Sequence, residues 1–156
     1  NNYELGMDVI KGHRAQRHVE LEALVKEHKQ YLAQSLTKIQ ENNSVEIMDN
    51  IQYFNGDDVK ASVVGTIAGM LLNNYDWQKP IVGYTHIDSD TPGYKVSLRC
   101  SRLLGYDGVH YGNLVRDISQ KCGGSGGGHS VACGAYIPED NIDQFLELLN
   151  NSVNFN

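Results

Sequence analysis

The chain contains 156 residues, of which 40% are hydrophobic, and its formal net charge at pH 7 is −6. This length and apolar content are typical of one compact domain, and the acidic balance excludes a protein that coats nucleic acid through bulk positive charge. No segment approaches the ~18 consecutive apolar residues of a membrane helix and the first residues show no signal pattern, so we expect a cytoplasmic protein with no membrane partner.

The first predicted element is a long helix. From about residue 12 to residue 43, positions three or four apart carry apolar or semi-apolar side chains, the pattern of one helical stripe. At ~1.5 Å per residue this helix spans about 45 Å, longer than a domain of this size uses internally. We therefore predict a connector helix over residues 1–44, and because the chain starts at Asn1 we expect it to be part of a larger protein. The stripe consists of Leu21, Val25, His28, Leu32, Leu36 and Ile39.

Strands and a helix are expected in the next segment. Alternating apolar residues at 45–48 and 51–54 predict a strand or a small hairpin, and a helix then runs to about residue 75. One face of this helix carries small residues that let it approach a sheet closely. A strand follows at 81–87. The candidate helix caps are Asn55, Asp57 and Asp58, and the small residues are Ala61, Gly65 and Gly69.

The strand predicted at 94–100 has one apolar face and one polar face. Side chains alternate along a strand, so Val96, Leu98 and Cys100 share the face that we assign to the core. The opposite face therefore projects polar groups away from that core. It carries Lys95, Ser97 and Arg99.

The last third of the chain predicts two more helices and a short strand. Apolar residues at helical spacing indicate a helix over 111–122, which ends at Gly123. A strand is expected at 134–137, and Pro138 suits the first position of a final helix. The order of elements predicts an α/β fold over residues 45–156, a single domain with a mixed sheet of about 4–5 strands and helices on its faces. The residues of the final helix that point inward are Ile142, Phe145, Leu146 and Leu149.

Positive charge is concentrated in one part of this domain. Residues 94–131 contain five basic and two acidic side chains, a net charge of +3, which leaves −9 for the rest of the chain. An acidic protein with one basic region suits a local anion site. The basic residues are Lys95, Arg99, Arg102, Arg116 and Lys121.

A glycine run, GGSGGGH at residues 123–129, lies inside this basic region. In a loop without side chains the backbone N–H groups are accessible to phosphate oxygens, and His129 can donate a further hydrogen bond. A P-loop is excluded because His129 replaces its lysine and because the run follows a helix rather than a strand. A flexible linker and a zinc site built from Cys122, His129 and Cys133 are alternative interpretations.

Two other groups of residues are explained better by structure than by ligand binding. Cys100, Cys122 and Cys133 lack paired spacing, which predicts free thiols in a reducing cytoplasm rather than disulfides. The sequence H-x-D-x-D, formed by His86, Asp88 and Asp90, has the composition of a turn between strands. We therefore predict no metal site in this chain.

The run GGSGGGHSVACGAYIP at residues 123–138 resembles the GGGH motif of the DHH-associated domain. That domain is the C-terminal half of the DHH phosphoesterases, which include the RecJ nucleases. The strand KVSLRCSR at 95–102 is similar to the second signature of the family, a strand carrying Ser-x-Arg. With weaker similarity in a helix at 59–72, the resemblance covers about residues 51–149.

The resemblance implies a substrate-holding domain. In this family a separate DHH domain holds two metal ions, usually manganese, which activate the water that attacks a phosphodiester. The chain contains no Asp-His-His triplet, so we predict no catalytic residue and no cofactor here, with Mn²⁺ or Mg²⁺ in an upstream DHH domain. The implied phosphate or nucleotide contacts are Ser97, Arg99, Gly126, Gly127, Gly128 and His129.

The function implied is phosphate binding within a RecJ-like single-strand exonuclease or oligonucleotide phosphodiesterase. The expected ligand is single-stranded nucleic acid or a small nucleotide. One alternative is a non-catalytic, RecJ-related assembly module of a replication complex, and another is the RNA-binding domain of an alanyl-tRNA synthetase-like protein. For Arg99, the alternative role is a surface salt bridge.

Overall fold

The computed structural model describes residues 2–105 and 108–153, which form two compact units, one ending at Ser35 and one beginning at Leu36. Helix α1 (Asn2–Glu41) makes up the first unit and continues into the second, where Ile39 is buried. Leu21 and Val25, at the other end of the predicted stripe, are exposed. None of the helices in the described part of the chain combines the length and the apolar character needed to cross a membrane.

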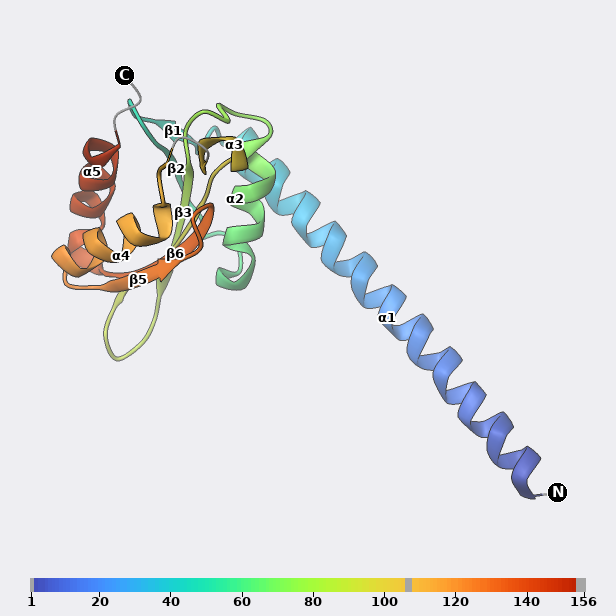
Figure 1. Ribbon diagram of the computed structural model, residues 1–156. Coiled ribbons are helices and arrows are strands. Elements are labelled where there is room, and N and C mark those ends of the chain that lie inside the picture. The colour runs from blue at the N-terminus through green and yellow to red at the C-terminus, as the bar shows by residue number, and fades with distance from the viewer. Residues whose placement is uncertain (1, 106–107, 154–156) are drawn as a thin grey trace. The chain divides into compact units, whose positions relative to one another are not determined.

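The second unit is built on a mixed six-stranded sheet in the order β1-β2-β3-β4-β6-β5 (Figure 1). Strands β2 and β3 are parallel, and every other neighbouring pair is antiparallel. The predicted α/β class and mixed sheet are confirmed, but the expected 4–5 strands were too few. The strands are β1 (Glu46–Ile47), β2 (Gln52–Asn55), β3 (Ile81–Ile87), β4 (Gly93–Arg99), β5 (Ser125–Gly128) and β6 (Ala132–Pro138).

Helices cover both faces of this sheet (Figure 1). Helix α2 connects the parallel strands β2 and β3 and packs on β3 and β4, whereas α4 packs on β5 and β6 and also contacts α5. Helix α2 therefore leaves the β6 and β5 end of its own face uncovered. The helices are η1 (Ala61–Val63), α2 (Val64–Leu72), α3 (Arg102–Gly105), α4 (Tyr111–Lys121), η2 (Glu139–Asn141) and α5 (Ile142–Ser152).

The main core lies between the sheet and helices α4 and α5. Val96, Leu98 and Cys100 are all buried in it, which confirms the apolar face predicted for β4. The inward residues predicted for the final helix are buried as well. At ~25 cal/mol per Å² of apolar surface, burial of these side chains is the main term that stabilises the sheet against its helices. The α5 residues in the core are Ile142, Phe145, Leu146 and Leu149.

Two predicted helix starts were wrong. The helix expected after residue 54 begins only at η1 and α2, and no side chain caps either of them. Asp57, a predicted cap, instead accepts a hydrogen bond from the backbone N–H of His86 at 2.6 Å. Pro138 ends strand β6 with extended backbone angles, φ −53° and ψ 145°, so it precedes the final helix rather than opening it.

The glycine run is an edge strand, not the loop that its composition predicts. Ser125–Gly128 forms β5 and pairs antiparallel with β6, which also excludes the flexible-linker interpretation. Glycine is disfavoured in strands because it loses entropy and offers no side chain to pack, so composition alone argued against this assignment. Gly127 and Gly128 have φ of +148° and +142°, which strongly favours glycine at both positions.

Close packing of α4 on β5 explains why glycine is also needed on the helix. A Cβ added to Gly112, in the first turn of α4, would collide with the backbone carbonyl of Gly128. The chain reaches β5 directly from the end of α4 through Gly123, whose φ is +81°. The helix therefore lies against the backbone of its own following strand.

We expect Gly112→Ala to destabilise the domain by about 1–3 kcal/mol, because the added methyl meets backbone that cannot move aside. The measurement is urea unfolding of the chain. Gly69→Ala is the matched control, since Gly69 is also helical and a Cβ there meets nothing within 4 Å. This control should be neutral or more stable by up to about 1 kcal/mol. Equal stability of the two variants would contradict the role of the α4–β5 contact.

Candidate functional site

A cavity of about 490 Å³ lies over the uncovered end of the sheet, beside the start of α2. Its floor is the polar face of β4 together with small residues of β6 and β5, and its wall is formed by η1 and α2. The wall contributes Ser62, Gly65 and Thr66. The floor contributes Lys95, Ser97 and Arg99 from β4, and Ala132, Gly134, Gly127 and Gly128 from β6 and β5.

Register explains why these floor residues lie together. Ser97 is opposite Gly134 on β6, and Gly134 is opposite Gly127 on β5, so the three residues form one row across the sheet. Side chains in such a row point to the same face. Because two of the three are glycines, backbone atoms are accessible at the floor of the cavity.

The guanidinium of Arg99 is fixed inside this cavity. Its Nη1 donates hydrogen bonds to the carbonyl oxygens of Leu98 at 2.8 Å and Cys133 at 3.3 Å. A Cβ added to Gly65 would lie 2.5 Å from Nη2, so glycine on α2 provides the space that the guanidinium occupies. These contacts hold one side of the group and leave its other donors available to a ligand.

Arg99 has no acidic partner among the side chains that the structure describes, residues 14–104 and 108–153. The surface salt bridge considered for Arg99 is therefore not formed within that part of the chain. A half-buried guanidinium with unused donors matches the bidentate geometry of a phosphate or carboxylate.

Three hydroxyl groups line the same cavity, those of Ser62, Thr66 and Ser97. Ser97 is buried, with 7% of its surface exposed. Ser62 and Thr66 are one helical turn apart on the wall. No described residue forms a hydrogen bond with any of the three hydroxyls, and no described carboxylate lines the cavity. Hydroxyl donors beside a guanidinium are suited to an anionic ligand rich in oxygen.

The structure brings together four of the six predicted contacts. Ser97, Arg99, Gly127 and Gly128 line one cavity. The other two do not belong to its lining. Gly126 lies in β5 opposite Ala135. His129 follows Gly128 in the turn to β6, where its side chain is exposed and its N–H donates to the carbonyl oxygen of Ala132 at 2.9 Å.

Sequence reasoning missed the helical wall and one cation of this site. Ser62, Gly65 and Thr66 come from a segment noted only for its small residues. A Cβ added to Gly69, which was grouped with Gly65, would meet nothing within 4 Å. Lys95 was assigned to the polar face of β4 but not to the site. Its signal was available, since strand alternation places Lys95 on the same face as Ser97 and Arg99.

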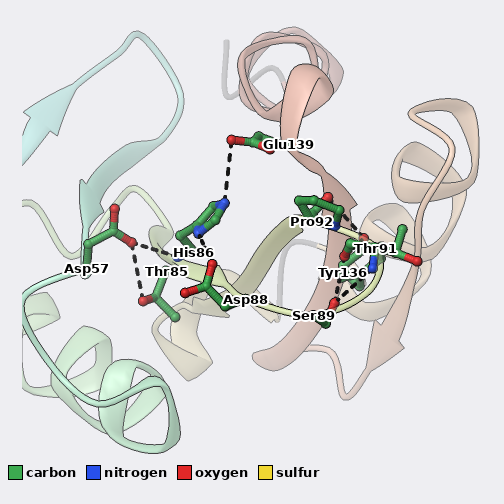
Figure 2. Close-up of polar contacts among 9 residues, drawn as sticks. All are labelled: Asp57, Thr85, His86, Asp88, Ser89, Thr91, Pro92, Tyr136 and Glu139. Carbon is green, nitrogen blue, oxygen red and sulfur yellow. Dashed lines mark hydrogen bonds and ion pairs between the residues drawn. The ribbon is translucent and has the colours of Figure 1, made fainter.

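The H-x-D-x-D segment forms a turn with a histidine between two acidic groups (Figure 2). His86 Nδ1 lies 3.6 Å from Asp88 Oδ1, and His86 Nε2 lies 3.5 Å from Glu139 Oε1. The two ring nitrogens thus face different carboxylates and do not converge on one point. The turn itself is closed by Ser89, whose hydroxyl donates to the carbonyl oxygen of Thr91 at 2.7 Å. No group of three potential metal ligands occurs among the described residues.

All three cysteines are buried, and none of them forms a disulfide. Burial raises the pKa of Cys100 to about 11 and that of Cys133 to about 12, and it also raises the pKa of Cys122. The thiolate is the nucleophile and the metal ligand, so these thiols are suited to neither role near neutral pH. Together with the exposed position of His129, this argues against the zinc alternative.

We expect the three thiols to resist iodoacetamide at pH 8 in the folded chain and to react fully in urea, because unfolding returns each thiol to its ordinary pKa. Mass spectrometry after a timed exposure measures the extent of alkylation. Raising the pH to 9 should increase labelling little while the domain stays folded. Rapid labelling of Cys133 under native conditions would contradict its burial.

The sequence model of the DHHA1 domain matches residues 28–154. The chain therefore belongs to the DHHA1 domain family, and the predicted resemblance to the DHH-associated domain is confirmed. This family match includes every residue of the cavity.

Two curated relatives come from Methanocaldococcus jannaschii. The uncharacterized protein MJ0831 is 34% identical over 117 residues, which cover 74% of this chain and 24% of that protein. The uncharacterized protein MJ0988 is 48% identical over 46 residues, covering 30% of this chain and 14% of that protein. The chain thus spans about a quarter, or less, of the length of these relatives.

Three solved structures share the fold. A protein described as a member of a family of ribosomal proteins, the PF0399 DHH domain, aligns with a TM-score of 0.58 and 18% identity over 84% of this chain and 32% of its own. The C-Ala domain of Aquifex aeolicus alanyl-tRNA synthetase gives 0.54 and 15%, over 69% and 95%. The pGpG-specific phosphodiesterase PggH of Vibrio cholerae gives 0.54 and 16%, over 82% and 42%. At these identities the likeness concerns the fold alone.

Proposed function

We propose that the cavity binds the phosphate of a nucleotide or of a single-strand end, and that the chain is the substrate-holding domain of a RecJ-like phosphodiesterase. The observation that carries this proposal is the guanidinium of Arg99, fixed by two carbonyls and lacking an acidic partner among the described side chains. Ser62, Thr66 and Ser97 supply hydroxyl donors around it. Such a set of groups holds and orients an anion and is not suited to attack it.

Catalysis in this proposal belongs to a DHH domain elsewhere in the full-length protein. Metal ions there, Mn²⁺ or Mg²⁺, would supply the activated water, and the residues of this chain would hold the phosphate or nucleotide in register with it. The fold shared with the pGpG-specific phosphodiesterase PggH supports this arrangement. His129 and Gly126, which lie outside the cavity lining, are proposed to contact parts of the ligand that extend beyond it.

A second candidate is an RNA-binding domain. It is favoured by the likeness to the C-Ala domain of alanyl-tRNA synthetase, 95% of which aligns with this chain. A titration that compares tRNA with short 5′-phosphorylated oligonucleotides separates the two functions. A non-catalytic assembly module would bind neither ligand at the cavity.

We expect Arg99→Lys to weaken binding of a 5′-phosphorylated dinucleotide by at least tenfold, because a lysine ammonium cannot reproduce two parallel hydrogen bonds to phosphate. Isothermal titration calorimetry of the 156-residue chain measures the change. Arg102→Ala is the matched control, since Arg102 is exposed and lies outside the cavity. Unchanged affinity of the Arg99 variant would refute the proposed function.

A second variant tests the cavity without removing a charge. Gly65→Ala places a methyl 2.5 Å from Arg99 Nη2, so the guanidinium must leave its position while the fold is retained. We expect affinity for the same dinucleotide to fall by about tenfold, roughly 1.4 kcal/mol. Gly69→Ala, on the same helix, adds a Cβ that meets nothing within 4 Å and should bind like the natural chain. Equal affinity of both variants would show that the position of Arg99 does not matter.

A further inference from the structure

Two cations line the cavity, at opposite ends of its polar strand. Lys95 and Arg99 both belong to the cavity lining and lie on the same face of β4, with Ser97 between them. Residues four apart on a strand have Cα atoms separated by about 13 Å. The cavity is therefore longer than one phosphate group.

The charged ends of both side chains reach the η1–α2 wall of the cavity. Lys95 Nζ lies 3.4 Å from the carbonyl oxygen of Ala61, and Arg99 Nη2 lies against Gly65. Ala61 and Gly65 are four residues apart on the η1–α2 wall, a rise of roughly 6–8 Å along the helix axis. These two positions on the wall are therefore about as far apart as neighbouring phosphates on an extended strand.

No described carboxylate compensates these two charges. Among the described side chains, none of the ion pairs involves Lys95 or Arg99, and no carboxylate lines the cavity between them. The contact of Lys95 with Ala61 is too long to be a strong hydrogen bond. Lys95 and Arg99 carry like charges and lie beside the same turn of helix, so they repel each other. A ligand with two negative groups is attracted to both of them and offsets this repulsion.

We infer that Lys95 is a second anion contact and that the cavity takes a ligand with two neighbouring phosphate groups. This inference rests on the proposed function, because it adds a residue and a substrate class to the same site. Arg99 holds one phosphate, Lys95 holds the next, and Ser97 lies between them. A 5′-phosphorylated oligonucleotide end and a nucleoside diphosphate share this chemistry, and they differ in the spacing of their phosphates.

The test is calorimetric titration of the 156-residue chain with three probes: thymidine monophosphate, thymidine diphosphate and the 5′-phosphorylated dinucleotide pTpT. Lys95→Ala should weaken pTpT binding by about tenfold, as expected for a lost charge-assisted hydrogen bond, and monophosphate binding by less than about twofold. Arg99→Ala should weaken both. Lys121→Ala, which removes a charge outside the cavity, should change neither.

The outcomes separate the inference from the function on which it rests. If no probe binds the natural chain, the proposed function fails. If the natural chain binds and Lys95→Ala affects the monophosphate and pTpT equally, or affects neither, the two-phosphate inference fails while the function stands. If the loss is found for pTpT and not for the monophosphate, the inference holds. If Lys95→Ala also weakens binding of thymidine diphosphate, the site accepts the closer phosphate spacing of a nucleoside diphosphate. If it does not, the site requires the wider phosphate spacing of an oligonucleotide.

Discussion

The fold depends on one close contact, between the backbone of helix α4 and the backbone of strand β5. Gly112 on the helix lies against the backbone carbonyl of Gly128 on the strand, and a side chain at Gly112 would block this approach. The strand in this contact is a glycine run that pairs with β6, although glycine has little intrinsic tendency to form a strand. The same pairing places Gly127 and Gly128 beside β6, where they extend the floor of the cavity.

The cavity itself results from an unequal covering of the sheet. Helix α2 packs on β3 and β4 and does not extend across β6 and β5. The residues of β6 and β5 on that face are small, so they leave space for the cavity above the sheet. Arg99 lies at the boundary, between the helix and the open end. Its guanidinium stays there because Gly65 makes room and because two carbonyl oxygens accept its hydrogen bonds. The same packing that completes the fold therefore orients the cation.

Membership in the DHHA1 family and the shared fold define the class of domain, but they do not identify its ligand. The side chains of the cavity have to do that. Proteins with this fold include a phosphodiesterase and a part of a tRNA synthetase, so fold alone does not select between them. The proposed selection rests on side chains: a fixed guanidinium, three hydroxyls and a second cation around one cavity. Each of these groups carries positive charge or can donate a hydrogen bond, which suits an anionic ligand.

Residue patterns alone were sufficient to predict strand β3, helix α4 and the buried face of β4, because burial of one face imposes a period on the residues. The position of Ser97 and Arg99 on the polar face of β4 was predictable for the same reason, whereas their role as ligand contacts was implied only by the family resemblance. Other features followed only from tertiary contacts: the glycines form a strand, Gly65 makes room for Arg99, and His129 lies outside the cavity. These features depend on contacts between segments distant in sequence, and a glycine carries no side chain whose pattern could reveal such a contact.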